Sequence, residues 1–435
     1  MRLKEYGRNA HKRKEYVHQP DLLLVGVDVS KAKHRACLGT QTTMSCRKLA
    51  FPPTREGFER FEQPLKAHLG KNGRQRLLIA MDPSGLYWQA LYEQLNSCGY
   101  EVCLGHCQAV RTNRKTMPDG TSKTDEKDAA SLFALLRQGT CFLPVARAPE
   151  RKAAYRLMPR HMALKKRVSH LRNQLRAALP RAVPELNPLV KDLTPPTAWR
   201  FLPANPTPAS VLCNGRTRFF AQWQPRQRCG PWRPATFHRL YALAQASSGL
   251  QAPSPLDAFE ITPLAGDLGD ALTTAQLGLD QAIALLAHRA DYQLLVPLPR
   301  IGQPTAAAIL TAIGDIHAYQ NGNQLVKLAG RELRLFASGS SIRKRPKLSP
   351  VGSAYRRDWL SHSALRLVAH EPQFKASYQR RKQQSPGKGA GHRALIAVCD
   401  KTIRLISRLL TDHAPYDPKK DQSIANSYAA QRKAA

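Results

Sequence analysis

Two acidic residues stand three positions apart late in the first third of the chain. Asp125 and Asp128 lie at the start of a segment, residues 128–137, that has the pattern of a helix. Positions i and i+3 share one helix face, so the two carboxylates should point the same way. Carboxylates held together repel unless a cation or proton lies between them, and hard oxygen ligands suit Mg²⁺ or Mn²⁺. Taken alone, acids at a helix N-terminus more often complement the helix dipole.

Two further acids follow apolar runs that are typical of buried strands. Asp28 comes directly after residues 22–27, and Asp82 comes directly after residues 76–81. Continuous apolar runs indicate strands buried on both faces, and parallel strands place ligands at their carboxyl ends. Alone, Asp28 could equally be a turn residue. Together the four carboxylates can converge, and they favour a two-metal site for phosphodiester chemistry.

The elements that position these acids predict an α/β domain over residues 21–148. The expected strands and helices, in chain order, are strands 22–27, 34–39 and 45–51, helix 55–69, strand 76–81, helix 86–95, strand 101–104 and helix 128–137. Residues 1–20 precede this domain and show no hydrophobic period. We expect them to form a flexible basic arm that touches phosphates.

The charge balance is the strongest global signal. The 435 residues include 67 Lys and Arg but only 31 Asp and Glu, a formal net charge of +36. Such a chain is expected to bind a polyanion, with nucleic acid as the first candidate, in a salt-dependent way. No apolar run of about 20 residues and no signal peptide is visible, so we expect no membrane contact.

The cysteines favour a reducing compartment, because there are nine of them without regular spacing. A zinc site at Cys103, His106 and Cys107 would lack a second ligand pair. We therefore expect this apolar stretch to belong to the core.

Residues 149–294 contain two apolar helical seams. The first consists of Leu164, Val168, Leu171, Leu175 and Leu179, and the second runs from Leu268 to Ala290. The seams predict two long helices that pair as an antiparallel hairpin or as a coiled coil between two copies. The basic face of the first helix, with Lys165, Lys166 and Arg167, is expected to contact phosphates. A solvated face packed on its own domain is the alternative.

Between the seams, prolines from residue 180 to 208 predict loops and short helices. Trp223, Trp232 and Phe237 lie among arginines and could stack on RNA bases. A small local aromatic core is the favoured interpretation.

Residues 295–416 predict a mainly helical C-terminal domain, followed by a disordered tail over residues 417–435. Residues 298–310 have the pattern of a helix-hairpin-helix, whose turn can offer backbone N–H groups to a DNA phosphate, or of a tight connection between helices. Helices are also expected at 355–368 and 392–410.

Ser338 precedes a glycine in what is expected to be a loop with basic residues. Those residues are Arg343, Lys344, Arg345 and Lys347. A loop serine by itself is most often structural or merely exposed, so this position gains meaning only from its surroundings.

Five stretches of this sequence resemble the DEDD transposases of bacterial insertion sequences, in insertion-sequence family one hundred and ten. Three lie in the N-terminal part, at residues 26–31, 81–88 and 123–129. Two lie in the C-terminal part, at residues 298–315 and at the Ser338-Gly339 pair that follows an Ala-Gly pair. The resemblance spans roughly residues 22–416 and is weakest between residues 180 and 260.

The resemblance implies that the N-terminal domain is RuvC-like, with a ribonuclease H fold, and binds Mg²⁺ or Mn²⁺. Its metal-binding acids would be Asp28, Asp82, Asp125 and Asp128. The family usually has Glu where this chain has Asp82, whose side chain is one methylene shorter. Lys31 and Lys123 stand beside these acids and are expected to contact nucleic acid.

The resemblance also implies that Ser338 is a nucleophile that forms a phosphoserine link with DNA. Ser340 and Ser341 are close alternatives in the sequence.

We therefore expect a DNA transposase that cuts and rejoins strands to move its insertion sequence, in the bacterial cytoplasm at the nucleoid. The resemblance further implies a bridge RNA that pairs with donor and target DNA, and a homo-oligomer, a dimer or a tetramer in the synaptic complex. Two alternatives remain open. One is a Holliday-junction-type endonuclease in which the acids act alone, and the other is a non-catalytic nucleic-acid-binding protein.

Overall fold

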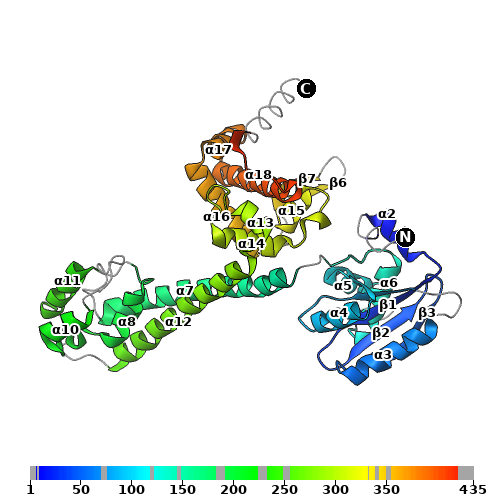
Figure 1. Ribbon diagram of the computed structural model, residues 1–435, viewed down its shortest axis with the longest axis horizontal. Helices are drawn as coiled ribbons and strands as arrows, with labels where there is room; N and C mark the ends of the chain where they lie inside the picture. Colours follow the sequence, from blue (N-terminus) through cyan, green and yellow to red (C-terminus); the bar gives the residue numbers. More distant parts are fainter. Residues whose placement is uncertain are drawn as a thin grey trace. The chain divides into compact units, whose positions relative to one another are not determined.

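The computed structural model describes residues 6, 9–69, 76–117, 122–144, 148–182, 192–223, 233–247, 255–331, 333–338, 342–348 and 354–419. The chain divides into two compact units, Met1–Val145 and Ala146–Ala435 (Figure 1). The first unit combines helices with a sheet and the second is mostly helical, as the sequence predicts. Within the described ranges, no helix is long and apolar enough to cross a membrane.

The first unit is built on a five-stranded sheet with the order β3-β2-β1-β4-β5. β1 (Leu22–Asp28), β2 (His34–Gly39) and β3 (Met44–Phe51) form an antiparallel meander. β4 (Arg76–Met81) pairs in parallel with β1, and β5 (Glu101–Leu104) pairs in parallel with β4. This is the succession of strands that the apolar runs predict.

Helices cover both faces of this sheet. They are α3 (Arg55–His68), α4 (Trp88–Ser97), α5 (Cys107–Lys115) and α6 (Asp125–Arg137). Successive side chains of a strand point to opposite faces. Leu23, Val25 and Val27 of β1 therefore join a core with α3 and α4. Leu22 and Leu24 join a second core with α5 and α6, so β1 is buried on both sides.

Gly26 allows α6 to lie directly on β1. A Cβ atom at this position would stand 2.5 Å from the backbone nitrogen of Phe133 and 2.6 Å from the carbonyl oxygen of Ala129. No side chain fits in that space, so glycine permits the close approach. The contact brings the first turn of α6 toward the end of β1.

The predicted flexible arm is wrong for the residues around α2 (Ala10–Val17). The Asn9 side chain caps this helix by accepting the Lys12 N–H at 2.8 Å. Tyr16 and Val17 are buried against the α6 side of the sheet, because burying their apolar surface outweighs the solvation of the helix's basic residues. Residues 1–5 and 7–8 lie outside the described residues.

The second unit contains two long helices, α7 (Pro149–Ala182) and α12 (Pro255–Leu286). They lie side by side in Figure 1. The ring Nδ1 of His161 lies 2.8 Å from the carbonyl oxygen of Ala275, and Arg181 pairs with Glu260 at 3.0 Å. Later residues of α7 thus meet earlier residues of α12. The structure therefore contains the first of the two predicted pairings, an antiparallel hairpin of two helices within one chain.

Four short helices enclose an aromatic core. They are α8 (Pro196–Ala204), α9 (Pro208–Leu212), α10 (Gly215–Trp223) and α11 (Pro234–Gln245). Phe201, Phe219 and Phe237 are buried there, and the Trp223 ring packs edge-on against Phe201 with centroids 5.1 Å apart. The favoured interpretation, a local aromatic core, is confirmed for Trp223 and Phe237. Trp232 lies outside the described residues.

The C-terminal part is helical apart from one hairpin. Its elements are α13 (Ala290–Leu295), α14 (Gln303–Ile313), the 3₁₀ helix η3 (Ile316–Ala318), α15 (Gly322–Leu328), β6 (Leu333–Ser338), β7 (Ile342–Leu348), α16 (Ala354–His370), α17 (Pro372–Gln384) and α18 (Ala390–Asp412). A turn in which Arg300 has a φ of 61° joins α13 to α14. This agrees with the predicted pair of helices, and its contact with DNA stays a prediction. Residues 420–435, in the expected disordered tail, lie outside the described residues.

The predicted domain boundary between residues 294 and 295 is wrong. Ala154 and Met158 of α7 and Leu286 of α12 share one core with Leu310 of α14 and Ile406 of α18. The start of α7 and the end of α12 are therefore part of the C-terminal core. Sequence periodicity shows that a helix has an apolar face but not what covers that face.

Candidate active site

Asp28 and Asp82 lie at the carboxyl ends of neighbouring parallel strands. Val27 of β1 and Met81 of β4 are paired in register, and each acid is the next residue along its strand. Parallel pairing keeps the two chains in step. Both acids are therefore brought to one edge of the sheet, as their positions after the apolar runs suggest.

Asp125 and Asp128 occupy the first turn of α6. The Thr124 side chain caps the helix by accepting the Lys127 N–H at 3.3 Å. The helix thus begins at Asp125, three residues before the start expected from the sequence, because the cap satisfies a free backbone donor. Asp125 is exposed, whereas Asp128 is buried with 8% of its surface accessible.

The four acids interact electrostatically. Burial and, after it, the nearby carboxylates of Asp128, Asp125 and Asp82 together raise the pKa of Asp28 to about 7, against an opposing effect of Lys123. A carboxyl surrounded by like charges in a partly buried site holds its proton more tightly. The structure therefore brings together the four acids that the sequence singles out, although their roles stay a prediction.

One carboxylate oxygen of Asp82 is free to accept a hydrogen bond or to bind a cation. Its Oδ1 atom is buried and accepts no hydrogen bond. Burial and an interaction with the Asp82 carboxylate raise the pKa of the Cys107 thiol to about 11. An unpaired buried carboxylate oxygen is costly unless a cation or donor satisfies it. The donor set thus fits a hard divalent cation such as Mg²⁺ or Mn²⁺.

The acids are not arranged around a common point in this conformation. Among the residues that the structure describes, no three or more His, Cys, Asp or Glu side chains are grouped closely enough to hold a metal ion. Asp128 instead accepts hydrogen bonds from Arg114 Nη1, at 2.6 Å to Oδ1 and 2.9 Å to Oδ2. A metal at Asp128 would therefore have to compete with this arginine.

Sequence reasoning did not find Arg114 or the contact of Cys107 with Asp82. Both residues lie on α5, the helix between β5 and α6 in the chain. Their spacing of seven residues places them two helical turns apart on one face. In the sequence, this spacing just after a predicted strand was the feature that could have indicated that both residues face the acids.

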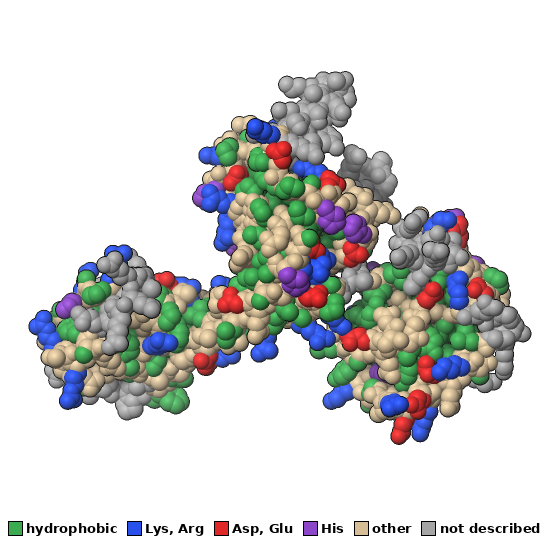
Figure 2. Space-filling view, in the orientation of Figure 1, with side chains coloured by type: hydrophobic (Ala, Val, Ile, Leu, Met, Phe, Trp, Pro, Cys, Tyr) green, Lys and Arg blue, Asp and Glu red, His purple; other side chains and the backbone are tan. Residues whose placement is uncertain are grey.

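The basic residues expected to contact nucleic acid are solvent-accessible where the structure describes their side chains. The exposed ones are Lys31, Lys123, Lys165, Lys166 and Arg167. Arg167 also pairs with Asp267 on α12 at 2.7 Å. Figure 2 shows Lys and Arg side chains spread over the visible face of each unit, with no single patch that holds most of them.

Ser338 is the last residue of β6, and its backbone pairs with Ile342 at the start of β7. The predicted basic loop is therefore wrong at Arg343, Lys344, Arg345 and Lys347, which belong to β7. An antiparallel partner gives these residues backbone hydrogen bonds that a loop would lack. The side chains of both strands, and residues 339–341, lie outside the described residues.

The expected core position is confirmed for Cys103 alone. Cys103 is fully buried, and its thiol lies 3.5 Å from the carbonyl oxygen of Ile79. His106 and Cys107 are exposed at the start of α5, because the strand ends at Leu104 and the chain turns into a helix there.

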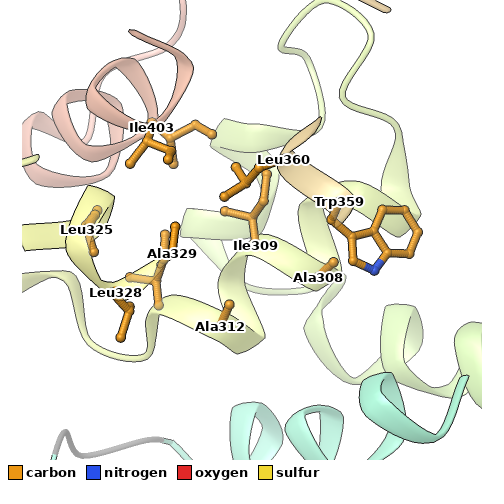
Figure 3. A pocket seen from close by; sticks show the side chains of 11 residues that line it. Ala308, Ile309, Ala312, Leu325, Leu328, Ala329, Trp359, Leu360 and Ile403 are labelled. Atoms are coloured by element: carbon orange, nitrogen blue, oxygen red, sulfur yellow. The ribbon is translucent and has the colours of Figure 1, made fainter. Parts of the chain in front are cut away.

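An apolar pocket in the C-terminal part is a poor candidate for catalysis. Its lining comes from α14, α15, α16 and α18 and includes Ile309, Leu325, Ala329, Leu360 and Ile403 (Figure 3). None of its lining residues has a titratable side chain. Phosphodiester chemistry needs charged or nucleophilic groups, so the edge of the sheet is the better candidate.

Two family models match the chain. Residues 25–184 match the DEDD-type model of the IS110 group, described as a transposase. Residues 292–379 match the model described as "Transposase IS116/IS110/IS902 family". The first match contains all four acids, and the second contains Ser338 and the α13–α14 turn.

Two curated relatives are similar over shorter stretches. The pilin gene-inverting protein of Moraxella bovis is 29% identical over 135 residues, which are 31% of this chain and 40% of that protein. The transposase for insertion sequence element IS1111A of Coxiella burnetii is 27% identical over 176 residues, which are 37% of this chain and 46% of that protein. The matched part of the chain thus spans less than half the length of each relative.

The α/β unit with its four acids and the helical second unit both lie within matches to transposase models. The two matches together cover more than half of the chain. The class that they define is that of the insertion-sequence transposases. Within that class, the chain belongs to the IS110 family.

Proposed function

We propose that this protein is a DNA transposase that cuts and rejoins DNA strands to move an insertion sequence. The main observation behind this proposal is that four carboxylates near one edge of the sheet influence one another electrostatically, within the stretch that matches the DEDD-type model. The printed name of the Coxiella burnetii relative, a transposase, supports the same activity. The net charge of +36 suits a polyanionic substrate.

The acids would bind Mg²⁺ or Mn²⁺. Asp28, Asp82 and Asp125 offer oxygen ligands, and Asp128 can join them once Arg114 has moved away. Such an ion, when bound, supplies positive charge that offsets the charge developing on the phosphoryl oxygens. Asp82 retains a carboxylate where the family usually has the longer Glu, so we propose that this copy keeps its metal site.

Ser338 would be the nucleophile. Its hydroxyl oxygen forms a bond to the phosphorus atom, the bond from phosphorus to one sugar oxygen breaks, and that oxygen leaves as a hydroxyl after taking up a proton. The serine proton passes to solvent. A hydroxyl of a second strand then attacks the phosphoserine and restores the free serine. Each step exchanges one phosphodiester for another, so the rejoining needs no external energy source.

A bridge RNA and a homo-oligomer complete the proposal. The support for the RNA is the resemblance to bridge-RNA-guided transposases, together with a charge that would suit RNA as well as DNA. A dimer, or a tetramer when both DNA partners are held, would bring two sets of acids and serines to the strands that are exchanged.

The test is recombination in cells between plasmids that carry the element's ends and a target. We expect Ser338→Ala and Asp125→Ala each to abolish joining. Matched controls are Ser341→Ala, which removes a nearby hydroxyl, and Glu126→Gln, which neutralises the acid next to Asp125. Both should retain joining within about threefold, since neither removes a group that the proposal uses.

The same assay separates the alternatives. If Ser338→Ala joins normally while Asp125→Ala is inactive, the serine mechanism is wrong and the acids act alone, as in a junction endonuclease. If neither substitution changes joining, the candidate site is wrong. A covalent protein–DNA adduct on a denaturing gel, lost in Ser338→Ala, would directly identify the intermediate.

A further inference from the structure

α5 covers the candidate active site with one face. Cys107, at the start of this helix, interacts with the Asp82 carboxylate, and Arg114, two turns later, binds Asp128. Val110, between them, is buried against α6. Arg111, one turn after Cys107, is exposed and lines a shallow cleft together with Cys107. The helix therefore directs Cys107 and Arg114 toward the acids.

The pair formed by Arg114 and Asp128 is almost enclosed. One guanidinium nitrogen donates to both carboxylate oxygens, at 2.6 and 2.9 Å. The two side chains are only 13% and 11% exposed. The Nε atom of Arg114 is buried without a hydrogen-bond partner. A charge in such a place is costly without its counter-ion, so each side chain depends on the other.

Arg114 and a divalent cation would compete for the Asp128 carboxylate in this geometry. The guanidinium occupies both oxygens of Asp128, and two positive charges at one carboxylate repel each other. Arg114 has no other acid within reach among the ion pairs of the described residues. A divalent cation at Asp128 is therefore opposed by the guanidinium beside it.

We propose that Arg114 is the resident counter-cation of Asp128 and that metal binding exchanges it for the divalent ion. This inference rests on the proposed function of the four acids. Without metal, Arg114 neutralises the most buried carboxylate and keeps the site folded. Its competition lowers the metal affinity of the free protein, so Arg114 is a positioning residue whose release accompanies loading of the site.

The first test is Mn²⁺ binding to the full-length protein, followed by the electron paramagnetic resonance signal of the free ion. We expect Arg114→Gln to bind Mn²⁺ about tenfold more tightly than the wild type, because the competing charge is gone. Arg114→Lys keeps a cation and should stay near the wild-type affinity. The matched control is Arg55→Gln, which removes the same charge from an exposed side chain on α3, on the other side of the sheet, and should change the affinity less than about twofold.

A second measurement does not depend on the folding of any variant. Wild-type protein is treated with phenylglyoxal, an arginine-directed reagent, with and without Mn²⁺, and modified peptides are mapped by mass spectrometry. We expect Arg114 to be protected in EDTA and at least about fivefold more reactive with Mn²⁺ bound, because its carboxylate partner is taken. The reactivity of the exposed Arg55 on α3 should not change.

Two outcomes overturn the inference in different ways. If the wild type binds Mn²⁺ but Arg114→Gln binds no more tightly, or Arg114 stays protected with Mn²⁺ bound, then Arg114 does not compete with the metal. If neither wild type nor Arg114→Gln binds Mn²⁺ at millimolar concentration, the proposed metal chemistry itself is wrong and the inference falls with it.

Discussion

Two acids at the edge of the sheet, Asp28 and Asp128, lie in surroundings that disfavour their negative charge. Asp28 lies beside three other carboxylates in a partly buried place, and Asp128 remains buried only with a guanidinium beside it. A protein that folds without metal must pay this electrostatic cost through protonation or through an internal cation. Asp28 illustrates the first solution and Asp128 the second.

The raised pKa of Asp28 predicts a pH-dependent stability. The folded protein holds this proton up to about pH 7, whereas the unfolded chain releases it near 3.8. Between these values the folded state binds more protons, so metal-free protein should become less stable as pH rises from about 4 to about 7. The effect is at most about 4 kcal/mol, and solvent screening reduces it.

Urea unfolding in EDTA at pH 5 and pH 7.5 measures this effect. Asp28→Asn, which cannot ionise, should lose most of the difference between the two pH values. Asp21→Asn is the control, since Asp21 forms only a long pair of 3.7 Å with Arg76 at the surface. Equal pH dependence in wild type and Asp28→Asn would show that Asp28 is not the titrating group.

At the scale of elements, the site depends on how closely α6 lies on β1. The four acids come from two strands and one helix, and only the position of α6 brings Asp125 and Asp128 to the strand ends. Gly26 sets that distance, because the backbone of α6 occupies the space of its missing side chain. α5 then covers the same edge with Arg114.

Gly26→Ala should therefore disturb both the fold and the site. The added methyl group meets backbone atoms at 2.5 and 2.6 Å, which cannot be relieved by rotating a side chain. We expect a loss of about 1–3 kcal/mol of unfolding free energy, as for other overpacked cores. Mn²⁺ affinity should also fall, because α6 must shift away from β1.

The matched control is Gly278→Ala on α12, where an added Cβ meets nothing within 4 Å. Alanine favours a helix over glycine by up to about 1 kcal/mol, so this variant should be as stable as the wild type or more so. Urea unfolding compares the two. A Gly26→Ala protein as stable as the wild type would contradict the close packing of α6 on β1.

At the scale of the whole molecule, the net charge of +36 is the dominant property. Lys and Arg side chains are spread over the visible face of both units (Figure 2), which suits an extended polyanion better than a small anionic ligand. The exposed basic face of α7 places Lys165 and Lys166 next to each other on a rigid helix.

Duplex DNA binding should weaken steeply with salt, and the double substitution Lys165→Gln with Lys166→Gln should reduce the slope of log K against log salt by about two. Fluorescence anisotropy over a salt series measures it. Lys66→Gln is the control, because Lys66 already pairs with Glu62 at 2.8 Å. An unchanged slope in the double variant would show that this face of α7 does not contact phosphates.

The sequence by itself determined the local elements and the set of acids. Apolar runs ending in Asp28 and Asp82 predicted the parallel strands, and the spacing of Asp125 and Asp128 predicted one helix face. These patterns are local, because strand and helix periods are properties of neighbouring residues. The family of the chain also followed from short stretches around these residues.

Only the tertiary structure decided which distant residues meet. It packed Tyr16 into the sheet core, placed Arg114 on Asp128, and joined Met158 and Leu286 to the core of the C-terminal helices. A sequence shows that a face is apolar or that a residue is charged, but not which partner covers it. That choice depends on packing and desolvation summed over contacts between residues far apart in the chain.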